Sequence, residues 1–112
     1  DLEDVHKWLD QAFYNGRRVG FAFSEIYKGE FKLDKLYIHP DVQRQGVGGQ
    51  LIEHVAARAK KNGYPCVILA VNKRNDKAIG SYKKYGFVVR EAIVDDIGRG
   101  FVMDDFVMEK KL

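Results

Sequence analysis

The sequence predicts a mixed α/β fold, in which helices pack on a single sheet. Segments with an apolar period near 3.6 alternate along the chain with shorter apolar runs that are typical of strands. Turn sequences containing glycine separate these segments, at Asn15–Gly16, Lys28–Gly29–Glu30 and Asn62–Gly63. Strands that alternate with helices in this way are typical of a mixed sheet covered by helices.

The first part of the chain is expected to form one helix and two long strands. Residues 1–12 are predicted as an amphipathic helix, because Leu2, Val5, Trp8, Leu9 and Ala12 recur at helical spacing. Asn15–Gly16 then predicts a hairpin turn. Strands are predicted over Val19–Tyr27 and Phe31–His39, and Pro40 is expected to end the second one.

A second helix is predicted from about Gly46 to Asn62–Gly63. Its apolar stripe consists of Val47, Leu51, Ile52, Val55, Ala56 and Ala59. The run Cys66–Val71 is continuously apolar, which suits a strand buried on both faces.

The last part of the chain is expected to form a third helix and two strands. Asn75 or Asp76 is suited to cap this helix, which Gly86 ends. The two final strands are expected over Phe87–Val94 and Phe101–Lys110, around a loop at Asp95–Gly100.

Length and composition indicate one globular domain, residues 1–112. The net charge is +3 and the calculated isoelectric point about 9.0. A diffuse positive field of this kind suits an anionic small molecule as well as a nucleic acid. Cys66 is a lone cysteine in an apolar run, and neither a signal peptide nor a membrane-spanning stretch is expected, so we expect a cytoplasmic protein.

The loop that follows Ile38 has the composition of an anion site. It is polar, and Gly46, Gly48 and Gly49 lie at the start of the second helix. The first amides of a helix lack internal partners and carry the positive end of the helix dipole. Glycines let a phosphate approach these amides, and Arg44 adds a charge. The same loop is equally compatible with a tight turn, and it matches neither the Walker loop nor the dinucleotide fingerprint.

Two blocks of the sequence resemble the GNAT-type N-acetyltransferases. Gln43-x-x-Gly46-x-Gly48 is similar to the acetyl-CoA-binding signature of that family. Asn75-x-x-Ala78-x-x-x-Tyr82-x-x-x-Gly86-Phe87 is similar to the family's second block, on the expected elements and in the expected order. The resemblance extends from about Val19 to the C-terminus. The tail around residues 97–105 resembles small bacterial acetyltransferases that include polyamine acetylators.

This resemblance implies a fold and an activity. The fold would be a mostly antiparallel sheet with helices on both faces and a V-shaped splay between the strands at 31–39 and 66–71. The activity would be transfer of an acetyl group from acetyl-CoA to a primary amine of a small molecule or peptide, by direct attack in a ternary complex. The family fold usually begins with a strand and a helix ahead of the helix predicted for residues 1–12, and we expect these to be trimmed from the sequence, supplied by another chain or lost in a protein that binds the cofactor poorly.

The resemblance also implies roles for individual residues. The backbone of Leu36, Tyr37 and Ile38 would pair with the pantetheine arm of acetyl-CoA. Asn75 and Ala78 would line its channel. Tyr82 would be the general acid that protonates the leaving thiolate, with Tyr85 as its rival on the same helix. The pyrophosphate would be bound by the loop Gln43, Arg44, Gln45, Gly46, Val47, Gly48 and Gly49.

The general base is left open by the sequence. Some members of the family carry a glutamate five residues before the position of Asn75, and this chain has Ala70 there. Glu25, Glu30, Asp34 and His39 are expected near the groove, and a water chain is a further alternative.

Two other function classes remain at this level. A non-catalytic acyl-CoA-binding or regulatory domain is one alternative. A nucleic-acid binder is the other, although the chain lacks a continuous basic helix and an aromatic stacking array. We therefore expect an amine substrate, no metal, no nucleic acid and no membrane as partners, and exposed edge strands near the C-terminus that allow a homodimer.

Overall fold

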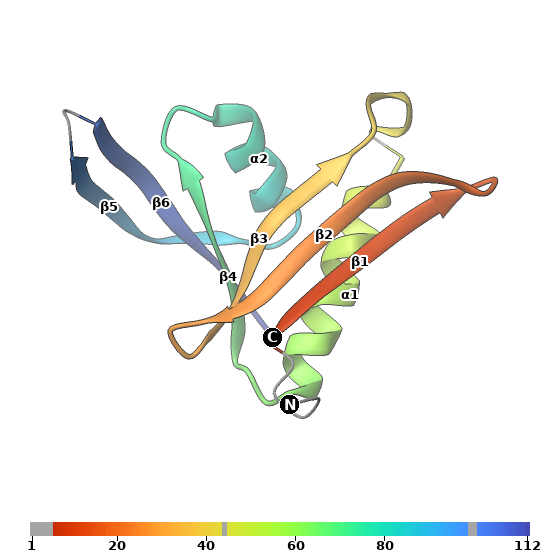
Figure 1. Ribbon diagram of the computed structural model, residues 1–112, viewed down its shortest axis with the longest axis horizontal. Coiled ribbons are helices and arrows are strands. Elements are labelled where there is room, and N and C mark those ends of the chain that lie inside the picture. Colours follow the sequence, from red (N-terminus) through yellow and green to blue (C-terminus); the bar gives the residue numbers. More distant parts are fainter. Residues whose placement is uncertain (1–5, 44, 99–100) are drawn as a thin grey trace.

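The computed structural model describes residues 6–43, 45–98 and 101–112, which form one six-stranded sheet with two α-helices (Figure 1). The strands are in the order β1-β2-β3-β4-β6-β5, and every neighbouring pair is antiparallel except β3–β4. This agrees with the mixed, mostly antiparallel sheet predicted from the sequence. The elements are β1 (Lys7–Tyr14), β2 (Arg17–Tyr27), β3 (Glu30–Ile38), a 3-10 turn (Pro40–Val42), α1 (Val47–Lys61), β4 (Cys66–Asn72), α2 (Asp76–Lys84), β5 (Val88–Gly98) and β6 (Phe101–Lys111).

The predicted first helix is wrong for residues 7–12, which belong to strand β1, while residues 1–5 lie outside the described part. Trp8, Asp10 and Ala12 are half-buried and alternate with exposed residues, which is the period of a strand. The helical spacing had combined side chains from the two faces of this strand. The predicted turn is confirmed, because Asn15 and Gly16 both have positive φ angles, 52° and 77°.

The remaining elements lie close to their predicted positions. Helix α1 buries Leu51, Ile52 and Val55 against the sheet and ends before Gly63, whose φ is 85°. One difference is the last hairpin, where the predicted loop Asp95–Gly100 is too long. Strand β5 continues to Gly98, and residues 99–100 lie outside the described part.

Strands β3 and β4 part soon after they meet. They pair only at Phe31–Val67 and Lys32–Ile68. Beyond these pairs β3 stays bonded to β2 and β4 stays bonded to β6, so the sheet opens into a V (Figure 1). The predicted splay is thereby confirmed. Because the strands are parallel, the V opens toward their carboxyl ends, where α1 and α2 begin.

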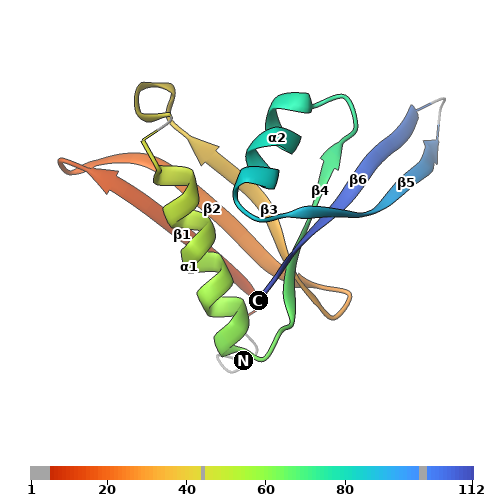
Figure 2. The ribbon, with the colours of Figure 1, turned by 180° about the vertical axis from the view of Figure 1, so that it is seen from behind.

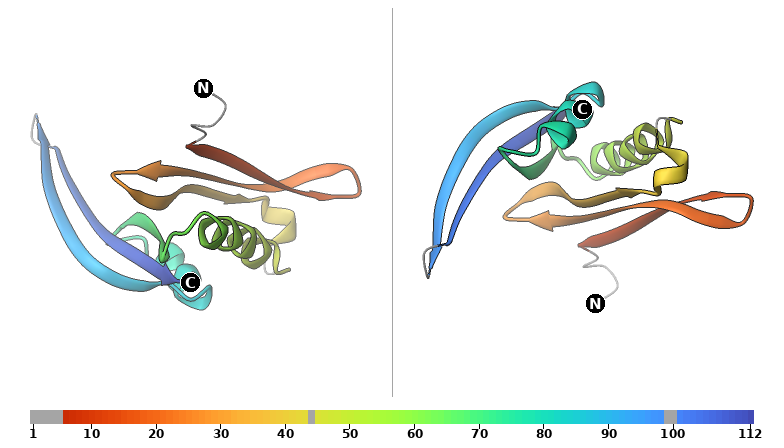
Figure 3. Two further views of the ribbon diagram at one scale, coloured as in Figure 1. Left: turned by 90° about the horizontal axis from the view of Figure 1, so that it is seen from below. Right: turned by 90° about the horizontal axis from the view of Figure 1, so that it is seen from above.

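Both helices lie on the same face of the sheet, rather than on both faces as expected (Figures 2 and 3). Tyr85, at the end of α2, packs against Gly48 and Gly49 at the start of α1. The reason is topological. The connections β3–α1–β4 and β4–α2–β5 each join parallel strands, and both progress in the same direction across the sheet. Because such crossovers have the same handedness, they place both helices on the same face.

The hydrophobic core lies between this helix-bearing face and α1. Phe31 is fully buried at its centre, stacked on Trp8 at 5.1 Å and edge-on to Tyr64 at 5.6 Å between ring centroids. The opposite face carries exposed apolar side chains, among them Leu9 and Tyr37.

An ion pair holds the edge strand β1 to helix α1. Arg58 of α1 donates two hydrogen bonds to Asp10 of β1, at 2.5 and 2.7 Å, and its guanidinium lies over the ring of Trp8. The Asp10 side chain is only 15% exposed, so solvent screens this pair incompletely.

We therefore predict that Asp10→Asn lowers the free energy of unfolding by about 1–2 kcal/mol, because a two-bond charged contact loses its anionic partner. Urea unfolding followed by circular dichroism measures the change. Glu53→Gln, on the exposed face of α1, is the control and should leave the midpoint unchanged. Equal midpoints for Asp10→Asn and the wild type would contradict a stabilising role for the pair.

Candidate active site

The loop between β3 and α1 is folded by local contacts. Pro40 opens a 3-10 turn, and the Nδ1 atom of His39 accepts a hydrogen bond from the amide of Asp41 at 3.1 Å. The side-chain amide of Gln43 donates to the carbonyl oxygen of Ile38 at 3.4 Å. These contacts return the chain from the end of β3 to the first turn of α1.

The first amides of helix α1 have no hydrogen-bond partner among the described residues. Gly46 is its N-cap, in the left-handed region at φ 82°, and the space that a Cβ atom would take is open. The first helical bond runs from the amide of Gln50 to the carbonyl of Gly46, at 3.0 Å. Among the described residues, the amides of Val47, Gly48 and Gly49 donate no recorded hydrogen bond. They present the positive end of the helix dipole.

Gly48 also allows the two helices to pack closely. A Cβ atom there would collide with the hydroxyl and ring of Tyr85. The absence of a side chain at this position therefore lets α2 approach α1, whereas Gly46 leaves open space beside the amides.

Helix α2 begins at the other arm of the V. The Asn75 side chain caps it by accepting a hydrogen bond from the amide of Ala78 at 3.2 Å. The prediction that Asn75 or Asp76 caps this helix is thus resolved in favour of Asn75.

A groove of about 1050 Å³ joins these parts. It brings together most of the residues predicted from the sequence. β3 and the loop after it contribute Leu36, Ile38 and Gln43. The start of α1 contributes Gly46, Val47 and Gly48. Helix α2 and its N-cap contribute Asn75, Ala78 and Tyr82.

Four predicted residues do not line the groove as described. The Tyr37 side chain lies on the opposite face, where it stacks on Phe21 at 5.6 Å. Gln45 and Gly49 are absent from the lining, and Arg44 lies outside the described residues. The sequence analysis missed Lys77, Ser81 and Lys84, which also line the groove. Helical spacing from Ala78 and Tyr82 would have indicated Ser81.

Tyr82 is a half-buried phenol in the wall of this groove. Its ring packs edge-on against Phe87, with 5.7 Å between centroids. Burial first, and then the neighbouring Tyr85, raise the pKa of Tyr82 above its ordinary value. The hydroxyl therefore stays protonated at neutral pH and is able to donate a proton. Tyr85 lines the same groove, with its hydroxyl against Gly48.

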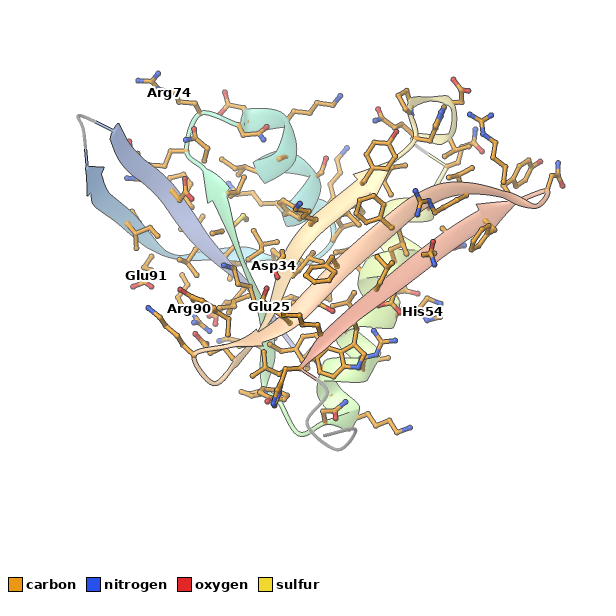
Figure 4. The ribbon with its side chains drawn as sticks, in the orientation of Figure 1. Glu25, Asp34, His54, Arg74, Arg90 and Glu91 are labelled. Carbon is orange, nitrogen blue, oxygen red and sulfur yellow. The ribbon has the colours of Figure 1, made fainter. Side chains whose placement is uncertain are left out.

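The four acid–base candidates are in different surroundings. Glu30 pairs with Arg90 at 2.7 Å, and the Nε2 atom of His39 lies 2.9 Å from Arg17. Glu25 and Asp34 instead lie side by side where β3 and β4 part (Figure 4). Arg90 also contacts Glu109 and the sulfur of Cys66, and burial raises the pKa of this half-buried thiol.

The described residues also bear on metal binding and on membrane-spanning helices. No group of histidine, cysteine or acidic side chains in these parts of the chain is arranged to hold a metal ion. None of the helices described is long and apolar enough to cross a membrane.

Sequence relatives cover about three quarters of this chain. The model of the acetyltransferase (GNAT) family matches residues 1–87. A peptidyl-lysine N-acetyltransferase, YjaB of Salmonella typhimurium, is 41% identical over 84 residues, 74% of this chain and 52% of the relative. The ribosomal protein bS18-alanine N-acetyltransferase of Escherichia coli is 35% identical over 77 residues, 69% of this chain and 52% of the relative. The chain spans about half the length of these curated relatives.

Solved structures share the fold across almost the whole chain. A PaiA N-acetyltransferase of Thermoplasma acidophilum, in complex with coenzyme A, has a TM-score of 0.79 and 26% identity, covering 99% of this chain and 64% of that one. The E. coli ribosomal-protein-S18-alanine N-acetyltransferase has a TM-score of 0.75 and 27% identity, covering 95% and 69%. Family match and fold agree with the glycine loop and the V-shaped sheet, and the chain therefore belongs to the GNAT family of acetyltransferases.

Proposed function

We propose that this chain is an acetyl-CoA-dependent N-acetyltransferase that acts on a primary amine by direct attack in a ternary complex. The observation that carries the proposal is the start of α1, where the amides of Val47 and Gly48 donate no hydrogen bond to any described residue and belong to the lining of a groove beside the open V. An anion site next to a gap in a sheet suits a cofactor with a phosphorylated end and an extended arm.

The residues present fit acetyl-CoA. The amides of Val47, Gly48 and Gly49 would bind its pyrophosphate, and the open space at Gly46 leaves room for it. Lys77 and Lys84 outnumber Asp76 among the charged residues that line the groove, which leaves it with a net positive charge. The edge of β3 beyond Lys32 has no strand partner on the side of β4, so its backbone groups are available to the amides of the pantetheine arm. The relative from T. acidophilum is a complex with coenzyme A, which supports this assignment.

The chemistry then divides among the chain's own groups. Acetyl-CoA supplies an acetyl group activated as a thioester. Tyr82 holds a proton on its hydroxyl at the groove wall and donates it to the departing sulfur, because a phenol has a pKa close enough to that of a thiol. The helix amides hold the cofactor, and the V positions the two reactants, which supplies much of the rate enhancement.

The acceptor is proposed to be an amine on a small molecule or a peptide. The relatives named above are described as acting on lysine side chains and on the alanine of a ribosomal protein. Those names favour a peptide or protein amine, and the exposed apolar face beside the V gives room for one.

We predict that acetyl-CoA raises the Tm of the wild type, because a ligand at 100 times its Kd stabilises a folded protein by about 2.7 kcal/mol. Gly46→Ala should raise the apparent Kd for acetyl-CoA by about tenfold or more and so reduce this Tm shift, because the added Cβ fills the space beside the amides. Gly63→Ala is the matched control, because Gly63 has a φ of 85°, close to the 82° of Gly46, and the space that a Cβ would take is open at both positions. Both variants should lose similar stability, and only Gly46→Ala should lose affinity. No shift in the wild type would contradict the proposal.

We also predict that Tyr82→Phe lowers kcat by about 100-fold while the Kd for acetyl-CoA stays unchanged, because the proton donor is lost and the ring remains. Thiol release across an amine panel measures the rate. Tyr85→Phe is the matched comparison and should retain most activity.

Since the pKa of Tyr82 is raised, wild-type activity should fall on the alkaline side only above about pH 10. A larger loss in Tyr85→Phe would transfer the acid role to that residue, and binding without turnover would indicate a non-catalytic acyl-CoA-binding domain.

A further inference from the structure

A second cavity lies on the face of the sheet opposite the helices. Its volume is about 530 Å³. Leu9, Phe21 and Phe23 supply apolar walls, while Glu25, Asp34 and Lys35 supply charged groups. Figure 4 shows Glu25 and Asp34 together near the closed end of the V. The cavity therefore lies across the sheet from the proposed cofactor groove.

A strand irregularity places Asp34 at the point where β3 and β4 separate. Phe23 pairs with Lys35 and Ser24 with Leu33, so Asp34 is an extra residue in the β2–β3 ladder. The last pair between β3 and β4 is Lys32–Ile68, and Asp34 comes two residues later. On β4, the residue two positions after Ile68 is Ala70, whose side chain has no ionisable group. Asp34 is thus the carboxyl group at the start of the gap.

The surroundings of Asp34 favour exchange of a proton. Its side chain is 18% exposed, and its Oδ2 atom has no hydrogen-bond partner among the described residues. The carboxyl of Glu25 is within hydrogen-bonding reach, and Lys32 lies 3.7 Å from Oδ1. Burial and then Glu25 raise the pKa of Asp34 to about 6, against the opposing effect of Lys32. Lys35 lines the same cavity, and the only titratable group on β4 is Cys66.

We propose that Asp34 is the catalytic base that deprotonates the acceptor amine, which enters through this second cavity, and that Glu25 is the residue that positions Asp34. The inference rests on the proposed acetyltransferase function. In the step, an N–H bond of the substrate ammonium breaks and an O–H bond forms on Asp34. The nitrogen keeps the electron pair and becomes a neutral nucleophile, and Asp34 later releases the proton to water.

The cavity also restricts the substrate. Its apolar walls suit the methylene groups or side chain beside an amine. Lys32 and Lys35 balance the formal charges of Asp34 and Glu25, and Lys7 lies opposite Glu25 in the β1–β2 ladder, so no net negative charge is left to attract a polycation. A substrate with one ammonium group is therefore favoured over a polyamine.

The kinetic test uses acetyl-CoA with a lysine-containing peptide, a peptide with a free N-terminal alanine, and spermidine. In the wild type, kcat/KM should rise with pH through about 6, where Asp34 becomes ionised. Asp34→Asn should lower kcat about 100-fold with an unchanged Kd for acetyl-CoA. Glu25→Gln should move the acidic limb to lower pH, because it removes a group that raises the pKa of Asp34. Glu91→Gln, an exposed carboxyl of β5, is the control (Figure 4).

A second readout needs no turnover. Because the folded-state pKa of Asp34 is raised, its favourable contribution to stability is fully present below pH 3.8 and is lost as the pH rises through about 6. Asp34→Asn should therefore have a higher Tm than the wild type at pH 8, and the difference should shrink toward pH 4. Glu91→Gln should show no such trend.

The outcomes separate the two proposals. If the wild type acetylates an amine and Asp34→Asn does so equally fast, or if Asp34→Asn gains no stability at pH 8, the role of Asp34 is wrong and acetyl transfer stands. If Asp34→Asn fails to fold, an unchanged acidic limb in Glu25→Gln overturns the inference. If acetyl-CoA neither shifts the wild-type Tm nor supports turnover, the proposed function fails and this inference fails with it. Binding without turnover of any amine contradicts both.

Discussion

The short contact between β3 and β4 is the constraint on which the rest of the structure depends. Two parallel residue pairs join the halves of the sheet, and beyond them each strand remains bonded to its other neighbour. The gap has to be stabilised without strand pairing. The packing of Tyr85 against Gly48 supplies one contact across it, since it joins the end of α2 to the start of α1. The same gap leaves backbone groups of β3 open to a ligand.

The two faces of the sheet have different chemistry as a result. One face carries both helices, and the groove there is lined by helix amides and lysines, which suit an anion. The other face carries aromatic rings and the Glu25–Asp34 pair, which suit an amine. The V is the place where a group held on one face can reach a group held on the other. The Tyr82 phenol and the Asp34 carboxyl are therefore kept apart, on opposite sides of the sheet.

The parts of the fold that depend on local chemistry were predictable from the sequence. Asn15–Gly16 and Gly63 adopt positive φ angles that few other residues tolerate, and Asn75 caps its helix through its own side chain. The predictions failed where contacts between residues far apart in the sequence determine the structure. Residues 7–12 become a strand because β2 is available for pairing, and Trp8 then packs on Phe31 rather than along a helix. The position of both helices on one face follows from strand order, which no single segment encodes.

The candidate site shows the same division. The spacing of Gly46, Asn75 and Tyr82 indicated most of the groove. Asp34 was only one of several acidic candidates, because its position depends on an extra residue in the ladder between β2 and β3 and on the separation from β4. Tyr37 appeared beside Leu36 and Ile38 in the sequence, yet strand alternation directs its side chain to the other face.

Arg90 of β5 connects the two halves of the sheet at the closed end of the V. It donates hydrogen bonds to Glu30, at the start of β3, and to Glu109 of β6. Because β3 and β4 share only two residue pairs, this guanidinium is a further link between the halves where they still touch. None of these three side chains lines the groove, so the spacing of the strands at this end depends in part on charged groups outside it.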